Sequence, residues 1–272
     1  MLNSSEAEFK MMYEAEEKLW WYRILHEKVL AETQQKFDDK KDISILDLGC
    51  GTGGLLDFLR KNNYQNLQGI DYSNASIYFS KLRNLKVEKA NIDDILYLFE
   101  GQQFDVIICN DVFYCLDKYQ IINALQNISL LLQEDGIFIS NNNAFNIFYG
   151  MHDIAVGGKW RFKLKDFQGF LQNTSLQIQY YSYWTWMISP LVLFIRILQQ
   201  IQLKLGLIDT TKLVSDVSLP PNWLNELLYK IVKMEEKILD KGFFGSSLFF
   251  SCSTGIFPVH RTSLHGKDSR DT

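Results

Sequence analysis

The chain has 272 residues, of which 47% are apolar and 22% are charged, and its formal net charge at pH 7 is −4. This composition is typical of a globular protein, and a net negative charge provides no basic surface for a phosphate backbone, so we expect no nucleic-acid partner. The four cysteines form no C-x-x-C pair and no His cluster has zinc-site spacing, so we expect reduced thiols and no metal.

Residues 6–36 are predicted to form one helix, because apolar residues recur there at helical spacing. Within this helix Trp20, Trp21 and Tyr22 are adjacent, so they cannot share one helix face. Either two of them pack against the rest of the domain, or they form an aromatic lid over a bound ligand. Residues 1–10 are polar and lack the apolar core of a secretory signal, so we expect a cytoplasmic protein.

Residues 43–59 contain the motif on which the functional argument rests. An apolar run, residues 43–48, predicts a buried parallel strand, and it is followed by a glycine-rich turn and an apolar helix pattern. Strand, glycine turn and helix in this order bring backbone N–H groups close to a nucleotide-like ligand. The spacing of Gly49, Gly51 and Gly54 also satisfies Gly-x-Gly-x-x-Gly, so the glycines alone do not identify the ligand.

The charges around this turn favour a nucleoside that carries positive charge. Asp47 precedes the turn, Asp57 follows it, and no Lys or Arg occurs within residues 43–59. A carboxylate repels a pyrophosphate and attracts an ammonium or sulfonium group. The absence of a P-loop lysine also argues against a mononucleotide phosphate.

Residues 47–53, Asp-Leu-Gly-Cys-Gly-Thr-Gly, closely resemble motif I of class I S-adenosylmethionine-dependent methyltransferases. The resemblance implies S-adenosyl-L-methionine as the cofactor. It also implies that Asp47, Gly49 and Gly51 hold the methionine end of this cofactor, with Cys50 among them.

The next two predicted strands complete the expected cofactor site. The second ends at Asp71, at the distance from Asp47 where a Rossmann-like unit has an acid that binds the ribose hydroxyls, and Tyr72 follows it. The alternative for Asp71 is an N-cap of the following helix. The third strand precedes Asn91 and Ile92, which the resemblance implies at the adenine. The family usually has an acid at the place of Asn91, and an Asn carbonyl can accept the same hydrogen bond.

A fourth strand, residues 104–109, ends at Asn110 in a segment that resembles motif IV, so the resemblance implies Asn110 at the methyl-transfer edge. Asp-Val-Phe follows instead of Pro-Pro-aromatic, which argues against the amino-methylating DNA enzymes. Many small-molecule relatives have a His at the place of Cys115, so one candidate base is missing here. The alternation of strands and helices predicts a parallel, doubly wound sheet.

The second half of the chain resembles one branch of these methyltransferases, in which His-Asp is followed by Gly-His and then Arg-Arg-Tyr. Here His152-Asp153 is kept, but Gly158 and Trp160 replace polar residues, which favours a less polar acceptor. His152, with Asp153, is a candidate general base because an unperturbed pKa of about 6.5 suits proton removal near neutral pH. The alternative for this His is a structural hydrogen bond. The residues expected on the acceptor side are Trp21, Tyr22, Lys159, Trp160 and Arg161.

Residues 183–195 form an apolar stretch that contains Pro190 and precedes Arg196. It is shorter than the ~20 residues of a spanning helix. It is either a helical cap buried on the domain or an interfacial helix, so that residues 183–200 contact a membrane. A further helix over residues 223–240 and a last strand over residues 247–253 are predicted after it.

The predicted fold class is α/β with a doubly wound, mostly parallel Rossmann-like sheet and N-terminal helices. The resemblance to the family implies that this sheet has seven strands, with a helical insertion before an antiparallel last strand. We expect an N-terminal helical lid at 1–37, the cofactor-binding core at 38–145, the rest of the sheet with an acceptor-side insertion at 146–254, and a disordered tail at 255–272.

The predicted function is methyl transfer from S-adenosyl-L-methionine, by in-line displacement, to a small hydrophobic acceptor such as a quinone, a polyketide or a lipid-like molecule. The alternatives are a non-catalytic module that binds S-adenosylmethionine or a lipid, and a nucleotide-dependent oxidoreductase.

Overall fold

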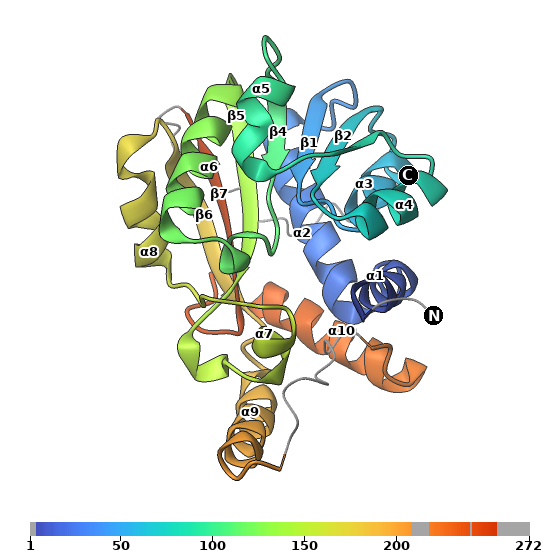
Figure 1. Cartoon of the computed structure of the whole chain (residues 1–272), viewed down its shortest axis with the longest axis vertical. Coiled ribbons are helices and arrows are strands. Elements are labelled where there is room, and N and C mark those ends of the chain that lie inside the picture. Colours follow the sequence, from blue (N-terminus) through green and yellow to red (C-terminus); the bar gives the residue numbers. More distant parts are fainter. Residues whose placement is uncertain (1–3, 208–217, 240, 255–272) are drawn as a thin grey trace, which may run out of the picture.

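The computed structural model describes residues 4–207, 218–239 and 241–254, and its centre is a seven-stranded sheet in the order β3-β2-β1-β4-β5-β7-β6 (Figure 1). β7 pairs antiparallel with both β5 and β6, whereas the other pairs are parallel. The predicted sheet with an antiparallel last strand is therefore confirmed. The strands are β1 (Ser44–Leu48), β2 (Asn66–Asp71), β3 (Val87–Lys89), β4 (Phe104–Ile108), β5 (Leu132–Asn143), β6 (Gln177–Trp184) and β7 (Ser247–Ser253).

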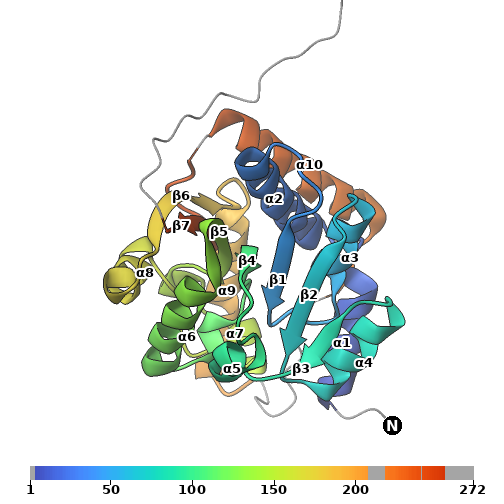
Figure 2. The ribbon, with the colours of Figure 1, turned by 90° about the horizontal axis from the view of Figure 1, so that it is seen from above.

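Helices cover both faces of the sheet (Figure 2). Side chains alternate along a strand, so Ile45 packs in a cluster with α2, α3 and α10, whereas Leu46 packs in a second cluster with α5, α6 and α8. The helices are α1 (Ser4–Ala15), α2 (Trp20–Phe37), α3 (Gly54–Lys61), α4 (Asn74–Leu82), α5 (Ile95–Leu98), α6 (Lys118–Leu131), α7 (Met151–Ala155), α8 (Leu164–Phe170), α9 (Ser189–Lys204) and α10 (Asn222–Ile238). Both faces are buried, as a parallel sheet requires.

The N-terminal segment forms two helices, so the single helix predicted over residues 6–36 is wrong. No Gly or Pro marks the break between α1 and α2. Leu19 is extended (φ −65°, ψ 128°), and the Trp20 backbone N–H donates to Asn225 Oδ1 at 2.9 Å. The start of α2 is thus capped by a side chain of α10, which lies 205 residues further along the chain and leaves no local signal.

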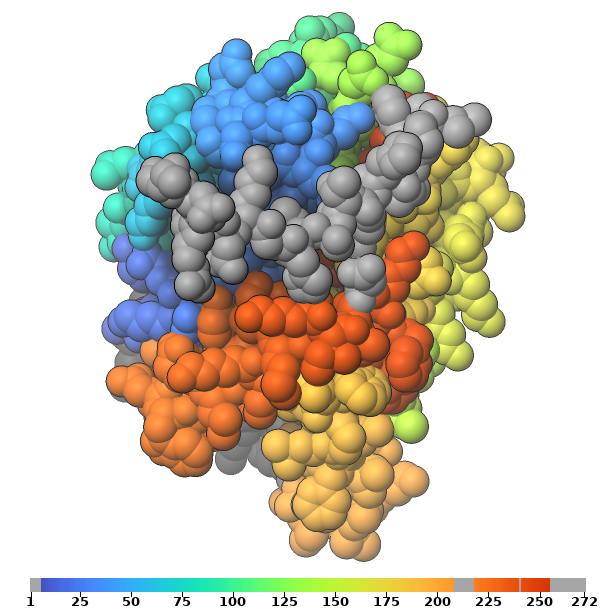
Figure 3. All heavy atoms as spheres, turned by 180° about the vertical axis from the view of Figure 1, so that it is seen from behind, coloured from blue at the N-terminus to red at the C-terminus, as the bar shows by residue number. Residues whose placement is uncertain are grey.

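The predicted helical insertion consists of α9 and α10, which lie between β6 and β7. α9 protrudes at the foot of the molecule, and of its residues only Ser189 is buried (Figures 1 and 3). Of the apolar stretch 183–195, the first part with Trp184 and Ile188 is buried on the domain, whereas Leu191 and Phe194 are exposed, so a buried cap describes only its first part. Within the described ranges, no helix is long and apolar enough to cross a membrane. The tail predicted at 255–272 lies outside the described residues.

Candidate active site

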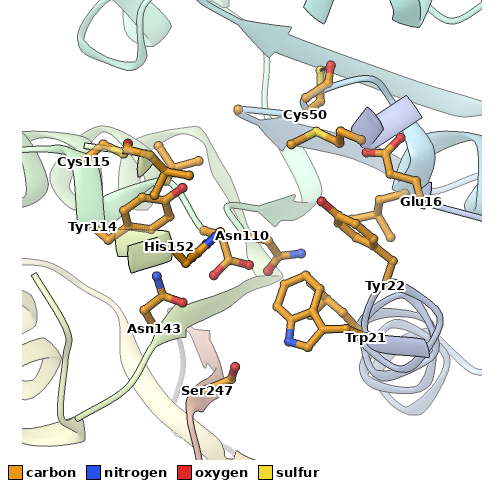
Figure 4. Close-up of a pocket in the computed structure, with 18 of the residues that line it drawn as sticks. Glu16, Trp21, Tyr22, Cys50, Asn110, Tyr114, Cys115, Asn143, His152 and Ser247 are labelled. Carbon is orange, nitrogen blue, oxygen red and sulfur yellow. Dashed lines mark hydrogen bonds between the residues drawn. The ribbon is translucent and has the colours of Figure 1, made fainter. Parts of the chain in front are cut away.

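One cavity of about 950 Å³ opens where β1, β2 and β4 end. Its wall brings together residues from both halves of the chain, with Glu16 and Cys50 at one end and Tyr114 and His152 across from them (Figure 4). All the predicted cofactor-binding residues line it: Asp47, Gly49, Cys50, Gly51, Asp71, Tyr72, Asn91, Ile92 and Asn110. The parallel strands place them together because their carboxyl ends meet at one edge of the sheet.

The glycine turn after β1 has a conformation that requires glycine. Gly49 has φ +74°, and a side chain there would collide with Val112 from the loop after β4. The N–H groups of Gly49 and Cys50 both donate to the Ile70 carbonyl at 2.9 Å. These contacts hold the turn against the end of β2 and leave its backbone at the cavity wall.

Asp71 links the end of β2 to the glycine turn. Its Oδ2 accepts from the Gly51 N–H at 3.0 Å and its Oδ1 accepts from the Ser73 N–H at 2.9 Å. Ser73 itself caps α4, since its side chain accepts from the Ser76 N–H, so α4 has a cap without Asp71. Burial raises the pKa of the Asp71 carboxyl.

Four carboxyl groups in the wall of this cavity have raised pKa values. Burial, with the nearby Glu16 and Asp71, raises the pKa of Asp47 to about 8. Burial also raises the pKa of Glu16 to about 7, although a hydrogen bond from Thr52 and the charge of Arg83 oppose this. The ionised forms of these groups lack sufficient counter-charge, which a cationic ligand would provide.

The positively charged side chains of the cavity wall come from a different part of the chain than the acidic ones. Of the described lining residues, the only Lys or Arg side chains are Arg161 and Arg196, both from the second half. The acidic end around Glu16, Asp47 and Asp71 therefore fits the ammonium and sulfonium groups of S-adenosylmethionine and disfavours a pyrophosphate.

The segment after β4 holds a carboxyl group that the sequence analysis did not single out. Asp111 lines the cavity beside Asn110, has φ +52° and is partly buried, and the loss of solvent around its carboxyl group raises the pKa of this group to about 7. Asn141 of β5 orders both residues: its N–H donates to Asn110 Oδ1 at 2.8 Å, and its Nδ2 donates to Asp111 Oδ2 at 3.0 Å. A left-handed backbone at a non-glycine residue often marks a functional position, and for Asp111 this feature is visible only in the structure.

The predicted His-Asp pair is divided between two environments. His152 lines the cavity, whereas Asp153 lies behind the wall in a buried ion pair, with its Oδ1 2.8 Å from Arg161 Nε. Asp153 also accepts from the Gly150 N–H at 2.8 Å. Asp153 therefore orients Arg161, which does line the cavity.

The predicted acceptor-side residues are only partly in the wall. Trp21 and Tyr22 line the cavity with Arg161, and Lys159 and Trp160 do not. Trp160 Nε1 donates to the Leu116 carbonyl at 2.8 Å, which fixes this ring in the core. Trp21 combines the two roles considered for the aromatic run, packing on the domain and covering a ligand. It lines the cavity and also stacks on Trp184, with ring centroids 5.7 Å apart. Further aromatic lining residues, among them Phe9, Tyr114 and Phe148, were not predicted as site residues.

Residues 39–157 match a family model described as a methyltransferase domain. Residues 39–157 therefore form a methyltransferase domain of class I type. S-adenosylmethionine is the methyl donor of this family, so the predicted family and its cofactor are confirmed. The matched residues comprise β1 to β5 and include every predicted cofactor-binding residue.

A curated relative of this chain is also described as a methyltransferase. The malonyl-[acyl-carrier protein] O-methyltransferase of Bacillus cereus is 29% identical over 126 residues, which is 46% of this chain and 46% of that protein. The chain thus spans about half the length of the curated relatives it matches.

Two solved structures share the fold across most of the chain. A putative sarcosine dimethylglycine methyltransferase from Galdieria sulphuraria superimposes with a TM-score of 0.56 at 13% identity, covering 86% of this chain and 88% of that one. A SAM-dependent methyltransferase from Archaeoglobus fulgidus has a TM-score of 0.51 at 15% identity, covering 84% and 93%. At such identities the similarity establishes the methyltransferase fold beyond the matched domain.

Proposed function

We propose that this protein transfers the methyl group of S-adenosyl-L-methionine to a small hydrophobic acceptor of a quinone-, polyketide- or lipid-like class. The observation that carries the proposal is the single cavity, which joins an acidic end on the motif I turn to a second part with apolar and aromatic walls. The apolar lining residues from the second half of the chain are Phe148, Ala155, Val156, Ile188 and Val192. Apolar walls with a few polar groups are typical of small-molecule sites.

The cofactor would supply an already activated methyl group, so the residues of this chain mainly hold the two reactants in line. Asp47, Gly49 and Gly51 would hold the methionine end, Asp71 the ribose, and Asn91 and Ile92 the adenine. Correct positioning alone contributes up to ~7–11 kcal/mol in well-oriented reactions.

An acceptor that loses a proton needs a base at the methyl-transfer edge. Asp111 and His152 both line the cavity, and the pKa of Asp111, about 7, suits proton removal near neutral pH. We therefore assign proton removal to Asp111 and keep His152 as the competing candidate. Asn110, held by Asn141, would position the acceptor beside the methyl group.

Peripheral membrane contact through residues 183–200 extends the same proposal. The exposed side chains of α9 are mostly apolar, and they include Leu191, Phe194, Ile197 and Leu198. Residues 167–207 contain Arg196 and Lys204 but no acid, which suits an anionic lipid surface. Val192 and Arg196 of the same helix line the cavity, so an apolar acceptor would have a short path from a membrane.

Calorimetry with S-adenosylhomocysteine tests the cofactor part of the proposal. We expect the wild type to bind in the micromolar range and Asp71→Ala to bind at least ~10-fold more weakly, because the variant loses a buried acceptor of hydrogen bonds. Leu130→Glu on the far exposed face of α6 is the control and should bind like the wild type. No binding by the wild type would contradict the proposed function. Transfer of labelled methyl groups to a panel of quinones and acyl compounds then tests the acceptor class.

A further inference from the structure

Glu16 is a buried acid between α1 and α2 that the methyl-transfer proposal does not use. Only 5% of it is exposed, and its carboxylate accepts a hydrogen bond from Thr52 Oγ1 of the motif I turn. Arg83, at the end of α4, donates to the same oxygen, Oε2, at 3.3 Å. The N-terminal segment is therefore tied directly to the turn that forms the cofactor site.

The glycine turn is shaped to admit this carboxylate. A side chain at Gly54 would collide with the Glu16 carboxyl group, and one at Gly51 would lie 3.8 Å from Glu16 Oε1. Oε2 is held by Thr52 and Arg83, whereas Oε1 is the oxygen on the side of Gly51. Glu16 itself lines the cavity, where Figure 4 shows it at the same end as Cys50. One oxygen of the carboxylate thus anchors the segment and the other is directed to the cofactor end.

The charge balance at this end favours a cationic partner for Glu16. Arg83 is shared, since it also donates to Glu17 Oε1 at 2.7 Å and to the Thr52 and Tyr13 carbonyls. Glu16 in turn raises the pKa of Asp47, so the ionised acids here repel one another. An ammonium group brings both positive charge and three N–H donors, whereas a sulfonium group has no N–H to donate.

We propose that Glu16 binds the ammonium group of the cofactor's methionine part, and so couples the N-terminal helices to occupancy of the cofactor site. This inference rests on the proposed function, because it assumes that the cavity takes S-adenosylmethionine. Phe9 and Met12 of α1 line the same cavity, so the helix that precedes Glu16 covers the site that Glu16 completes.

Calorimetry with two probes at pH 8 tests the assignment. S-adenosylhomocysteine carries the ammonium group, and 5′-deoxy-5′-methylthioadenosine lacks the whole amino-acid part. Glu16→Gln, which keeps the shape and removes the charge, should bind S-adenosylhomocysteine at least ~10-fold more weakly and bind methylthioadenosine within about 2-fold of the wild type. The ratio of the two effects isolates the contact with the amino-acid part. A loss points to its ammonium group, because removing a negative charge would favour the carboxylate group of the same part.

Glu17→Gln is the matched control, because Glu17 pairs with the same Arg83 but does not line the cavity. It should bind both probes like the wild type. Thr52→Val provides a second variant should Glu16→Gln not fold: it frees the anchored oxygen and should weaken binding of S-adenosylhomocysteine alone.

Three outcomes separate the explanations. Equal affinity of wild type and Glu16→Gln for S-adenosylhomocysteine overturns the assignment and leaves the proposed function standing. An equal loss for both probes also overturns it, since it shows a general structural effect. A wild type that binds neither probe contradicts the proposed function itself.

Discussion

At the scale of single residues, Asp111 is held in the cavity wall by Asn141, whose own orientation is fixed by Trp184. Trp184 Nε1 donates to Asn141 Oδ1 at 2.9 Å, and an indole N–H can only donate. This contact fixes which end of the Asn141 amide faces Asp111, so Nδ2 donates to the carboxylate. The carboxyl group is thus held by a chain of hydrogen bonds that starts in the core.

We expect Asp111→Asn to lower methyl transfer by ~10²–10⁴-fold with little change in S-adenosylhomocysteine affinity. The substitution preserves shape, and Asn tolerates the left-handed backbone of this position, so the fold should persist. His152→Asn is the matched comparison and should cost less than ~10-fold. The labelled-methyl assay measures both variants. A large loss in His152→Asn together with an active Asp111→Asn would transfer the role of base to His152.

At the scale of elements, α2 depends on α10 for its start. Asn225 Oδ1 accepts from the Trp20 N–H, and Asn225 Nδ2 donates to the Lys18 carbonyl at 2.8 Å. One buried amide therefore satisfies one backbone group within the break between α1 and α2 and another at the start of α2.

Asn225→Ala should lower the free energy of unfolding by ~1–2 kcal/mol, because it removes a helix cap and leaves two partly buried backbone groups unpaired. Chemical denaturation monitored by circular dichroism measures the change. Asn222→Ala, at the exposed first residue of α10, is the control. A loss below about 0.5 kcal/mol in Asn225→Ala would show that the cap is dispensable.

α9 is the second element with a testable role. The double substitution Phe194→Glu and Leu198→Glu introduces charge on one exposed apolar face, so we expect vesicle binding to fall by at least ~10-fold. Co-sedimentation with vesicles that contain anionic lipid measures it, and Leu130→Glu on α6 is the control. If the wild type stays in the supernatant, residues 183–200 do not bind such membranes.

At the scale of the whole molecule, the buried acids of the cavity make stability depend on pH. The folded-state pKa values of Asp47, Glu16 and Asp111 lie above their ordinary values, at about 8, 7 and 7. The folded protein therefore binds more protons than the unfolded chain. This contribution to stability is complete below the ordinary carboxyl pKa values and is lost as the pH rises through the folded values.

The free protein should accordingly lose several kcal/mol of unfolding free energy between pH 6 and pH 8, roughly 1.4 kcal/mol per pH unit for each carboxyl group that releases its proton. Affinity for S-adenosylhomocysteine should increase over the same range, because its ammonium group favours the ionised carboxylates. Urea denaturation and calorimetry at the two pH values measure the opposite trends. Asp47→Asn should flatten the stability profile, and stability that rises with pH in the wild type would contradict this account of the cavity.

The sequence alone was sufficient for the sheet, the family and its cofactor, and it identified residues that the fold then gathers in one cavity wall. Asp47, Gly49 and Gly51 are contiguous in motif I, and Asp71 follows at the next strand, so their proximity depends on local geometry and on the rule that parallel strands end at one edge. Burial of a strand also leaves an apolar pattern in the chain, which is why individual strands such as 43–48 and 104–109 could be predicted, whereas the resemblance to the family implied that the sheet has seven strands.

Only the tertiary structure revealed what depends on contacts between distant segments. The break before Trp20 is stabilised by Asn225, the setting of Asp111 by Asn141 and Trp184, and the access of Glu16 to the cofactor end by Thr52 and Arg83. Each of these depends on burial and on partners that lie tens to hundreds of residues away, and such partners leave no periodic trace in the sequence. The methyl donor could therefore be predicted from local motifs, whereas the positions of Asp111 and Glu16 in the cavity wall depend on packing between distant segments.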